Sequence, residues 1–207
     1  MNKTYLLRDE LKIGEGAHRI VYEHPENHNR CIKIVKPRRA HKTKEHLLEQ
    51  RYYKVLEKNN ISWEMLPRYY GNVATNFDEG AVFDLIRDHN GEVSSTLRDY
   101  LQNEDAFTKN QQGLAEALTQ FRIYMETNGI VTRRIATVNL VYQKIDDNRG
   151  RLVLIDNIGN TDFVPLANYM RWFACLKFRR RWQRFRQDIS EQHGAEVENM
   201  LNADNAF

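Results

Sequence analysis

Cysteine is scarce in this sequence: its two cysteines, Cys31 and Cys175, lie far apart and form no Cys-x-x-Cys pair. This scarcity excludes a cysteine-rich zinc module and is typical of proteins kept in a reducing compartment. Long apolar runs are also missing, since no stretch approaches the roughly 20 residues that cross a bilayer. The amino terminus lacks the apolar segment of a signal peptide. We therefore expect a cytoplasmic protein.

Charge is nearly balanced overall but unevenly distributed. The 207 residues include 31 Lys and Arg and 28 Asp and Glu, for a formal net charge of +3. The stretch from Phe163 to Gln187 contains no acidic residue and seven basic ones, so its charge needs a local explanation. With 41% hydrophobic residues, the composition excludes disorder for most of the chain and predicts one or two ordinary domains.

Short apolar and β-branched runs dominate the first third of the chain and predict strands. A helical pattern interrupts them over His41–Lys58, which contains no glycine or proline. We expect a five-stranded antiparallel sheet with this one helix. The expected strands are Leu11–Gly14, Ile20–His24, Arg30–Val35, Arg68–Ala74 and Ala81–Ile86.

Helical patterns dominate the rest of the chain, and a polar tail is expected from Gly194 onward. The expected helices are Ser95–Gln102, Asn110–Thr127 and Leu166–Ile189, with a hairpin of Asn139–Gln143 and Arg151–Ile155 before the last. This order predicts an α+β protein with two lobes. Residues 1–86 would form the sheet lobe and residues 87–207 a reduced, mostly helical lobe, with a joint near Asp84 to Gly91.

Two glycines, Gly14 and Gly16, lie in a turn between two expected strands, ahead of Val21. Glycine lets the backbone approach a phosphate closely, although a plain hairpin turn explains the same pattern. Lys33 interrupts an apolar strand, where its ammonium either faces water at a sheet edge or needs a buried partner. Glu49 lies on the apolar face of the next helix and could be that partner. A strand lysine paired with a helix glutamate positions nucleotide phosphates in one large group of phosphotransferases.

Two polar residues mark the hairpin of the second half. Asp156 ends an apolar strand, and Asn139 opens the strand before it. Each residue type is also common as a cap or turn residue. A carboxylate and an amide oxygen brought to one end of a hairpin are, however, suitable ligands for Mg²⁺.

With these residues in order, the chain resembles the protein-kinase superfold. In this resemblance the glycine-rich loop is Gly14, Gly16 and Val21, the strand lysine is Lys33, its helix partner is Glu49, the catalytic-loop asparagine is Asn139 and the metal-binding aspartate is Asp156. More closely, the chain resembles the bacterial PhoP regulatory network protein YrbL family, through Arg-Cys-Ile-Lys-Ile-Val, Pro-Arg-Tyr-Tyr-Gly, Asp-Asn-Ile-Gly and the Trp- and Arg-rich final helix. The resemblance spans about Leu11 to Gln187. It implies ATP and Mg²⁺ between two lobes and a place in a bacterial stress-response network.

The chain departs from the kinase pattern at its catalytic loop. That pattern has an aspartate where this chain has Arg134 and a lysine where it has Ala136. Arginine stays protonated in proteins, so Arg134 cannot act as a general base. Asp162 is a candidate replacement. The residues after Gly159 are too few for an activation segment and the helices that hold a peptide substrate, so we expect no peptide substrate bound in the usual way.

The final helix offers a second line of interpretation. Its apolar residues form a narrow seam, namely Cys175, Phe178, Trp182, Phe185 and Ile189. The simplest interpretation is that this seam docks on the second lobe while the arginines face water. The alternatives are that the basic stretch Lys177–Arg186 contacts an anionic membrane or nucleic-acid phosphates.

Two functions therefore stay open from the sequence. The first is a divergent kinase-like protein that binds ATP and Mg²⁺ and transfers phosphate to a non-protein or unknown acceptor. Lys33, Glu49 and Asp156 would act at the phosphates, and Asn139 and Asp156 would hold the metal. The second is a catalytically inactive pseudokinase, a binding module that acts on a partner through its basic helix.

Overall fold

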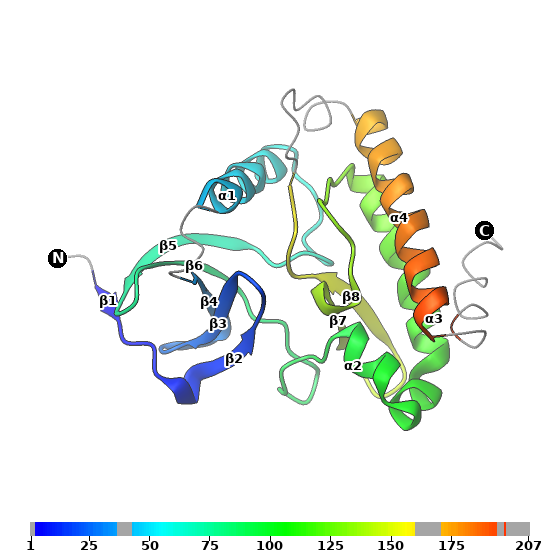
Figure 1. Ribbon diagram of the computed structural model, residues 1–207, viewed down its shortest axis with the longest axis horizontal. Coiled ribbons are helices and arrows are strands. Elements are labelled where there is room, and N and C mark those ends of the chain that lie inside the picture. Colours follow the sequence, from blue (N-terminus) through cyan, green and yellow to red (C-terminus); the bar gives the residue numbers. More distant parts are fainter. Residues whose placement is uncertain (1–2, 37–42, 160–170, 194–196, 198–207) are drawn as a thin grey trace.

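The computed structural model describes residues 3–36, 43–159 and 171–193 together with Val197. The amino-terminal part is a curled sheet with one helix against it, and the carboxy-terminal part is mostly helical (Figure 1). The fold class is therefore α+β, as the sequence predicts. No helix within the described ranges is both long enough and apolar enough to cross a membrane.

The sheet has six strands in the order β1-β5-β6-β4-β3-β2. Its strands are β1 Thr4–Tyr5, β2 Lys12–Glu15, β3 Arg19–His24, β4 Asn27–Val35, β5 Tyr69–Thr75 and β6 Glu79–Asp84. The expectation of five antiparallel strands is wrong in one respect, because β1 adds a sixth strand that runs parallel to β5. Two residues are too few to produce the alternating pattern by which strands are found in a sequence.

Strand β4 separates two apolar clusters. Because side chains alternate along a strand, Cys31 and Lys33 face one side of the sheet while Ile32 and Ile34 face the other. Cys31 belongs to the main core, which continues into the helical part, and Ile32 and Ile34 belong to a smaller cluster with Val82. Lys33 therefore faces the main core and the helical part of the chain.

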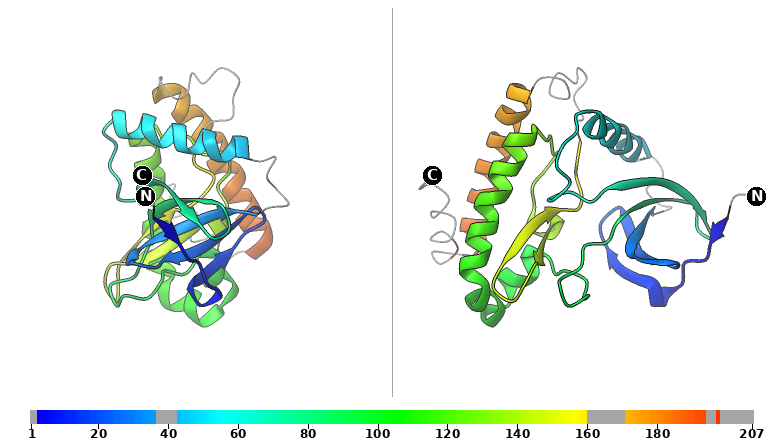
Figure 2. Two further views of the ribbon diagram at one scale, coloured as in Figure 1. Left: turned by 90° about the vertical axis from the view of Figure 1, so that its left-hand side faces the viewer. Right: turned by 180° about the vertical axis from the view of Figure 1, so that it is seen from behind.

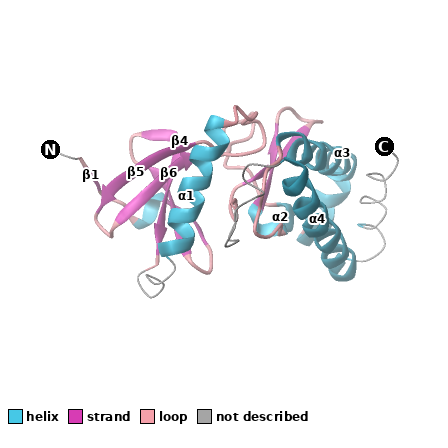
Figure 3. Ribbon diagram, turned by 90° about the horizontal axis from the view of Figure 1, so that it is seen from above, coloured by secondary structure: helices cyan, strands magenta, loops and turns pink. Residues whose placement is uncertain are grey.

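Helix α1, Thr43–Lys58, lies across the sheet on the main-core side (Figure 3). Its buried aromatic residues explain this position: Tyr53 contacts Phe83 of β6 edge to face, with 5.3 Å between the ring centroids. Glu49 is on the same buried side of α1 and only 2% exposed. The expected start at His41 lies outside the described residues.

The second part begins with α2, Leu97–Gln102, and α3, Glu104–Asn128. Helix α3 starts six residues before the expected Asn110, because the Asn103 side chain accepts a hydrogen bond from the backbone N–H of Ala106 and caps it. It ends where Gly129 adopts a left-handed conformation, with φ at 60°. The hairpin of β7, Leu140–Lys144, and β8, Gly150–Leu154, follows within a residue of its expected position.

Helix α4, Arg171–His193, runs alongside α3 in every view (Figures 1 and 2). Aromatic residues join the two helices, since the ring of Phe121 in α3 lies 6.1 Å from that of Trp182. The expected seam is buried at Phe178, Trp182, Phe185 and Ile189, with Ala174 as its fifth member. Cys175 is only partly buried. The expected helix start at Leu166 lies outside the described residues, as does most of the expected tail.

Candidate functional site

Lys33 reaches from the middle of β4 to the second part of the chain. Its ammonium donates a hydrogen bond to the carbonyl oxygen of Ile155 at 2.6 Å, and the side chain is 6% exposed. The ammonium also lies 4.4 Å from the centre of the Phe83 ring. Lys33 is thus a buried, satisfied cation beside the residue that precedes Asp156, and the alternative of an exposed edge-strand lysine is excluded.

Asp156 follows β8 directly and retains access to solvent, with 34% of its side chain exposed. The backbone N–H of Asn157 donates a hydrogen bond to its Oδ1 at 2.5 Å. Burial opposes ionisation of Asp156, but the cationic Arg19 and Lys33 outweigh this effect and lower the pKa of the carboxyl group. Asp156 is therefore an accessible carboxylate held in its charged form.

Asn139 lies at the same end of the hairpin as Asp156. It ends the 3-10 turn Thr137–Asn139 and precedes β7. Leu140 pairs with Leu154, and the Asn139 carbonyl accepts a 2.8 Å hydrogen bond from the backbone N–H of Ile155. The structure therefore brings the backbones of Asn139 and Asp156 close together, as the hairpin prediction requires.

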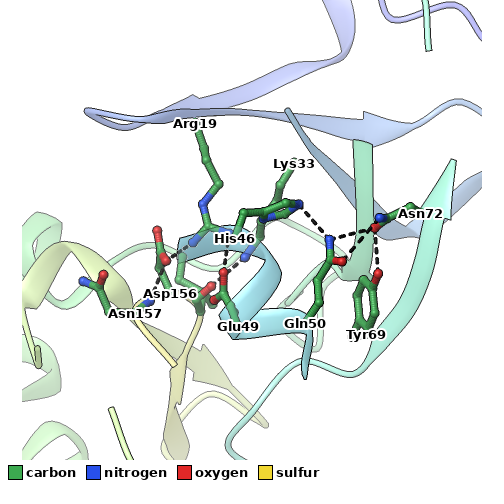
Figure 4. Close-up of polar contacts among 10 residues, drawn as sticks. Arg19, Lys33, His46, Glu49, Gln50, Tyr69, Asn72, Asp156 and Asn157 are labelled. Carbon is green, nitrogen blue, oxygen red and sulfur yellow. Dashed lines mark hydrogen bonds and ion pairs between the residues drawn. The ribbon is translucent and has the colours of Figure 1, made fainter. Parts of the chain in front are cut away.

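Glu49 pairs with an arginine that the sequence analysis missed. Its Oε2 accepts a hydrogen bond from Nη1 of Arg19 at 2.6 Å, while Nη2 of the same guanidinium contacts Oδ1 of Asp156 (Figure 4). The structure thus joins Glu49 to Arg19, whereas the sequence analysis expected an ion pair between Glu49 and Lys33. Burial lowers the Arg19 pKa, and the two carboxylates more than compensate, so that the pKa is raised overall.

A signal for Arg19 is present in the sequence. The glycine-rich loop pattern has three glycines in the order G-x-G-x-x-G, and Arg19 occupies the third position in this chain. Arg19 opens β3 and its side chain is 11% exposed. A charged residue in place of a loop glycine therefore could have identified it.

The glycines of the β2–β3 turn have open surroundings. Gly14 pairs with Val21 across the turn, and Val21 pairs with Lys33 on β4. Among the described residues, a Cβ atom added to Gly14 would meet nothing within 4 Å, and one added to Gly16 would meet only the Arg19 carbonyl at 3.9 Å. Neither glycine has a positive φ angle. Neither the backbone conformation nor packing in the described part of the chain requires glycine at these two positions.

The segment that contains Arg134 supports the backbone next to Asp156. Asn157 adopts a left-handed conformation with φ at 63°. Its carbonyl accepts hydrogen bonds from the backbone N–H of Arg133 at 2.7 Å and from Oγ1 of Thr132 at 2.9 Å. The side chain of Arg134 is exposed. Asp162, the candidate for the missing acid, lies outside the described residues.

A series of hydrogen-bonded polar side chains connects α1 with the sheet near Glu49 (Figure 4). His46 Nε2 lies 2.8 Å from Nε2 of Gln50, which donates to Oδ1 of Asn72 at 2.9 Å. Burial, and then the nearby Arg19, lower the pKa of His46, so the neutral ring is favoured. These hydrogen bonds link the buried face of α1 to strand β5.

Within the described ranges, no group of three or more His, Cys, Asp or Glu side chains is arranged to hold a metal ion. Mg²⁺ does not need such a group, because it is commonly held by one or two carboxylates together with water and substrate phosphates. The carboxylate of Asp156 and the amide oxygen of Asn139 are oxygen ligands of the kind that Mg²⁺ requires.

The basic helix α4 is partly engaged with the rest of the chain. Arg179 forms an ion pair with Glu126 of α3 at 2.9 Å. Arg181 donates from Nε to the carbonyl of Arg133 at 3.1 Å, while its Nη1 is buried and has no hydrogen-bond acceptor in the part of the chain that the structure describes. Burial and the neighbouring Arg184 lower the Arg181 pKa. Arg181 is therefore held close to the segment that supports Asp156.

Comparison with known proteins gives consistent matches over most of the chain. The family model of the PhoP regulatory network protein YrbL matches residues 5–190. The "Uncharacterized protein YrbL" of Escherichia coli strain K12 is 35% identical over 179 residues, which cover 86% of this chain and 85% of that protein. The protein of the same name from Shigella flexneri matches with the same identity and coverage.

Proposed function

The chain belongs to the PhoP regulatory network protein YrbL family, and from this premise we propose that it binds a nucleoside triphosphate with Mg²⁺ as a kinase-like component of such a network. In this proposal residues 1–86 and 87–207 are the two lobes of a reduced protein-kinase-like fold. The triphosphate lies between them, beneath the turn that contains Gly14 and Gly16.

The observation that carries the proposal is the contact of Lys33 with the end of β8. The ammonium bonds to Ile155, so a cation from the sheet lies one residue from the accessible carboxylate of Asp156. A lysine ammonium is a common phosphate ligand, and a carboxylate beside it is suited to the metal that accompanies the phosphates. The two residues are 123 positions apart in the sequence, so the fold rather than local sequence brings them together.

The two glycines add independent support. Since neither packing among the described residues nor backbone conformation requires glycine at Gly14 and Gly16, their open surroundings are consistent with contact to a molecule outside the chain. A backbone without side chains can approach phosphate oxygens closely and donate its N–H groups to them.

Each residue then has a defined task. Lys33 binds phosphate oxygens, and Asp156 and Asn139 offer the oxygens that would hold Mg²⁺. When bound, Mg²⁺ neutralises phosphate charge and orients the triphosphate. Glu49 holds Arg19, which lies at the end of the glycine turn. Arg134 cannot remove a proton from an acceptor, so transfer of the phosphoryl group requires another base or proceeds slowly.

A thermal unfolding series tests the proposal. ATP with Mg²⁺ at about 100 times its dissociation constant should stabilise the wild-type protein by about 2.7 kcal/mol. Lys33→Met should lose this shift, whereas Lys54→Met, which changes an exposed lysine of α1, should keep it. Equal shifts in the wild type and Lys33→Met would contradict the proposed site. ATP consumption by the wild type that disappears in Asp156→Asn would identify an enzyme. ATP binding without ATP consumption would identify a nucleotide-dependent regulator.

A second candidate function, contact with an anionic membrane surface, is favoured by the exposed side of α4. Trp172 and Leu176 are 58% and 45% exposed, and the exposed Arg180 and Arg184 continue the same four-residue spacing. Residues four apart lie on neighbouring positions of one helix face. A face with an exposed tryptophan at one end and arginines at the other suits the boundary between acyl chains and anionic headgroups.

Vesicle sedimentation tests this candidate. Vesicles that contain phosphatidylserine should bind the wild-type protein, and binding should weaken with salt and in an Arg180→Gln/Arg184→Gln protein. Arg98→Gln/Lys109→Gln, which removes two exposed charges from other helices, should bind like the wild type. Binding to a DNA oligonucleotide without binding to the vesicles would contradict the membrane candidate.

A further inference from the structure

Arg19 connects two carboxylates that come from different parts of the chain. Its guanidinium is held by Glu49 of α1 and by Asp156, which follows β8 (Figure 4). Glu49 is buried at 2% exposure, Arg19 is largely buried, and Asp156 is partly exposed. A buried guanidinium with two charged partners is strongly oriented, since its planar donors match carboxylate geometry.

The charges of Arg19, Lys33, Glu49 and Asp156 balance without any ligand, and Arg133 adds a further positive charge that acts on Asp156. Arg19 and Lys33 supply two positive charges, and Glu49 and Asp156 supply two negative ones. Among the described residues, Arg19 and the backbone N–H of Asn157 each donate a hydrogen bond to Asp156, and both reach Oδ1. A metal ion that approached Asp156 would therefore meet a carboxylate whose charge Arg19 already neutralises, and it would be repelled by the guanidinium beside it.

We propose that Arg19 is an electrostatic latch: in the free protein it neutralises Asp156 and weakens the binding of a divalent metal there, and its release from Asp156 strengthens that binding. This proposal rests on the proposed function, because it concerns the same site. Phosphate groups offer the released guanidinium a new anionic partner with equally suitable geometry. Metal and triphosphate therefore bind together, and the metal alone binds weakly.

The position of Arg19 couples the latch to the glycine turn. The Arg19 carbonyl accepts a 2.9 Å hydrogen bond from the backbone N–H of Gly16, so the residue that holds Asp156 also closes the turn that would cover the phosphates. In the three-glycine loop pattern the third position carries no charge. Arginine at that position gives this chain a cation that is attached to the loop itself.

Calorimetric titration of the 207-residue chain with Mn²⁺ alone tests the latch. Arg19→Met removes the competing cation, and we expect it to bind Mn²⁺ at least about tenfold more tightly than the wild type. Arg19→Lys retains the charge and should bind like the wild type. Arg19→Met/Asp156→Asn should lose the gain, because the carboxylate is the ligand.

Glu49→Gln provides the opposite test and does not depend on the folding of Arg19→Met. It leaves Arg19 with Asp156 as its one carboxylate partner in the cluster, so Mn²⁺ affinity should fall below that of the wild type. Affinity that is unchanged or weaker in Arg19→Met, or unchanged or stronger in Glu49→Gln, would overturn the latch. Failure of ATP to bind the wild type would instead overturn the proposed function, so the two failures are distinguishable.

Discussion

The backbone N–H of Val131 donates a 2.8 Å hydrogen bond to the phenol oxygen of Tyr52. Both residues are buried, at 0% and 3% exposure. Tyr52 lies in α1, three residues after Glu49, and Val131 leads into the segment that supports Asn157. The hydrogen bond therefore fixes the helix that carries Glu49 to the loop beside Asp156, and it helps to hold the two parts of the site in register.

Tyr52→Phe should destabilise the protein, because it leaves the buried N–H of Val131 without an acceptor. The expected loss is about 1–3 kcal/mol of unfolding free energy, which urea unfolding can measure. Tyr70→Phe is the matched control, since Tyr70 is 43% exposed and its hydroxyl donates to Asp84 at the surface. Equal losses in the two variants would show that the buried bond contributes nothing beyond a surface contact.

Gly80→Ala and Gly14→Ala should differ in their effect on the stability of the protein. A Cβ atom on Gly80 would lie 2.4 Å from Cγ2 of Ile32 and 2.6 Å from Cδ1 of Ile34. Gly80→Ala should therefore cost about 1–3 kcal/mol of stability through overpacking. Gly14→Ala should leave stability within about 0.5 kcal/mol of the wild type, since that position is open.

The same Gly14→Ala protein should respond less to ATP and Mg²⁺ in thermal unfolding, because the added methyl group obstructs the approach of phosphate. A loss of stability as large as that of Gly80→Ala would assign Gly14 a structural role. The support that the glycine turn gives to nucleotide binding would then disappear.

Glu23 should contribute a pH-dependent part of the stability. Its carboxylate accepts a hydrogen bond from His28 and another, at 2.7 Å, from Nη2 of Arg87 in the joint between the two parts. The hydrogen bond from His28 lowers the Glu23 pKa, burial opposes this, and Arg87 lowers the pKa further. A folded-state pKa below the unfolded value means that the stabilisation is present above the unfolded pKa and is lost as pH falls through the folded one.

Urea unfolding of the wild type and Glu23→Gln checks this linkage. The difference in stability between the two proteins should be largest near about pH 6 and should shrink toward about pH 3, on either side of the usual glutamate pKa. The other carboxylates are present in both proteins, so they change the unfolding free energy of both with pH in the same way. A difference that stays constant with pH would contradict a role for the Glu23 charge.

Elements with a clear period were predictable from the sequence, whereas partners across the fold were not. Strand β8 lies within a residue of its expected bounds because its apolar run is continuous and bounded by turn residues. Strand β1 was missed because two residues carry no period. Helix α3 was predicted too short because the capping side chain of Asn103 lies ahead of the clearest part of its apolar stripe.

The partner of Glu49 shows a different limit. The sequence indicates that Glu49 faces the sheet, because the apolar residues of α1 share its side of the helix. It does not indicate whether Lys33 or Arg19 reaches that carboxylate, since both cations belong to strands of the same sheet. The outcome depends on where β8 ends, because Lys33 bonds to Ile155 and Arg19 contacts Asp156. Packing between segments far apart in the sequence therefore determines which cation pairs with Glu49.

Lys33→Met should separate ligand binding from stability. Lys33 is buried, and burial of a charge carries a large desolvation cost even where a carbonyl accepts a hydrogen bond from it. Methionine fills a similar volume and can pack on the Phe83 ring that the lysine now covers. Asp156 keeps Arg19 as its partner, so the substitution leaves no isolated carboxylate in the cluster. We therefore expect the ligand-free variant to be as stable as the wild type within about 1 kcal/mol, or more stable.

Leu56→Ala, which truncates a core residue of α1 that is 1% exposed, should by contrast lose about 2–5 kcal/mol. Urea unfolding of the three proteins without ligand measures both effects. A loss in Lys33→Met as large as that in Leu56→Ala would mean that the lysine is present to hold the fold together. Unchanged or raised stability means that the chain bears the cost of a buried ammonium for a reason outside its own folding, and a bound phosphate is such a reason.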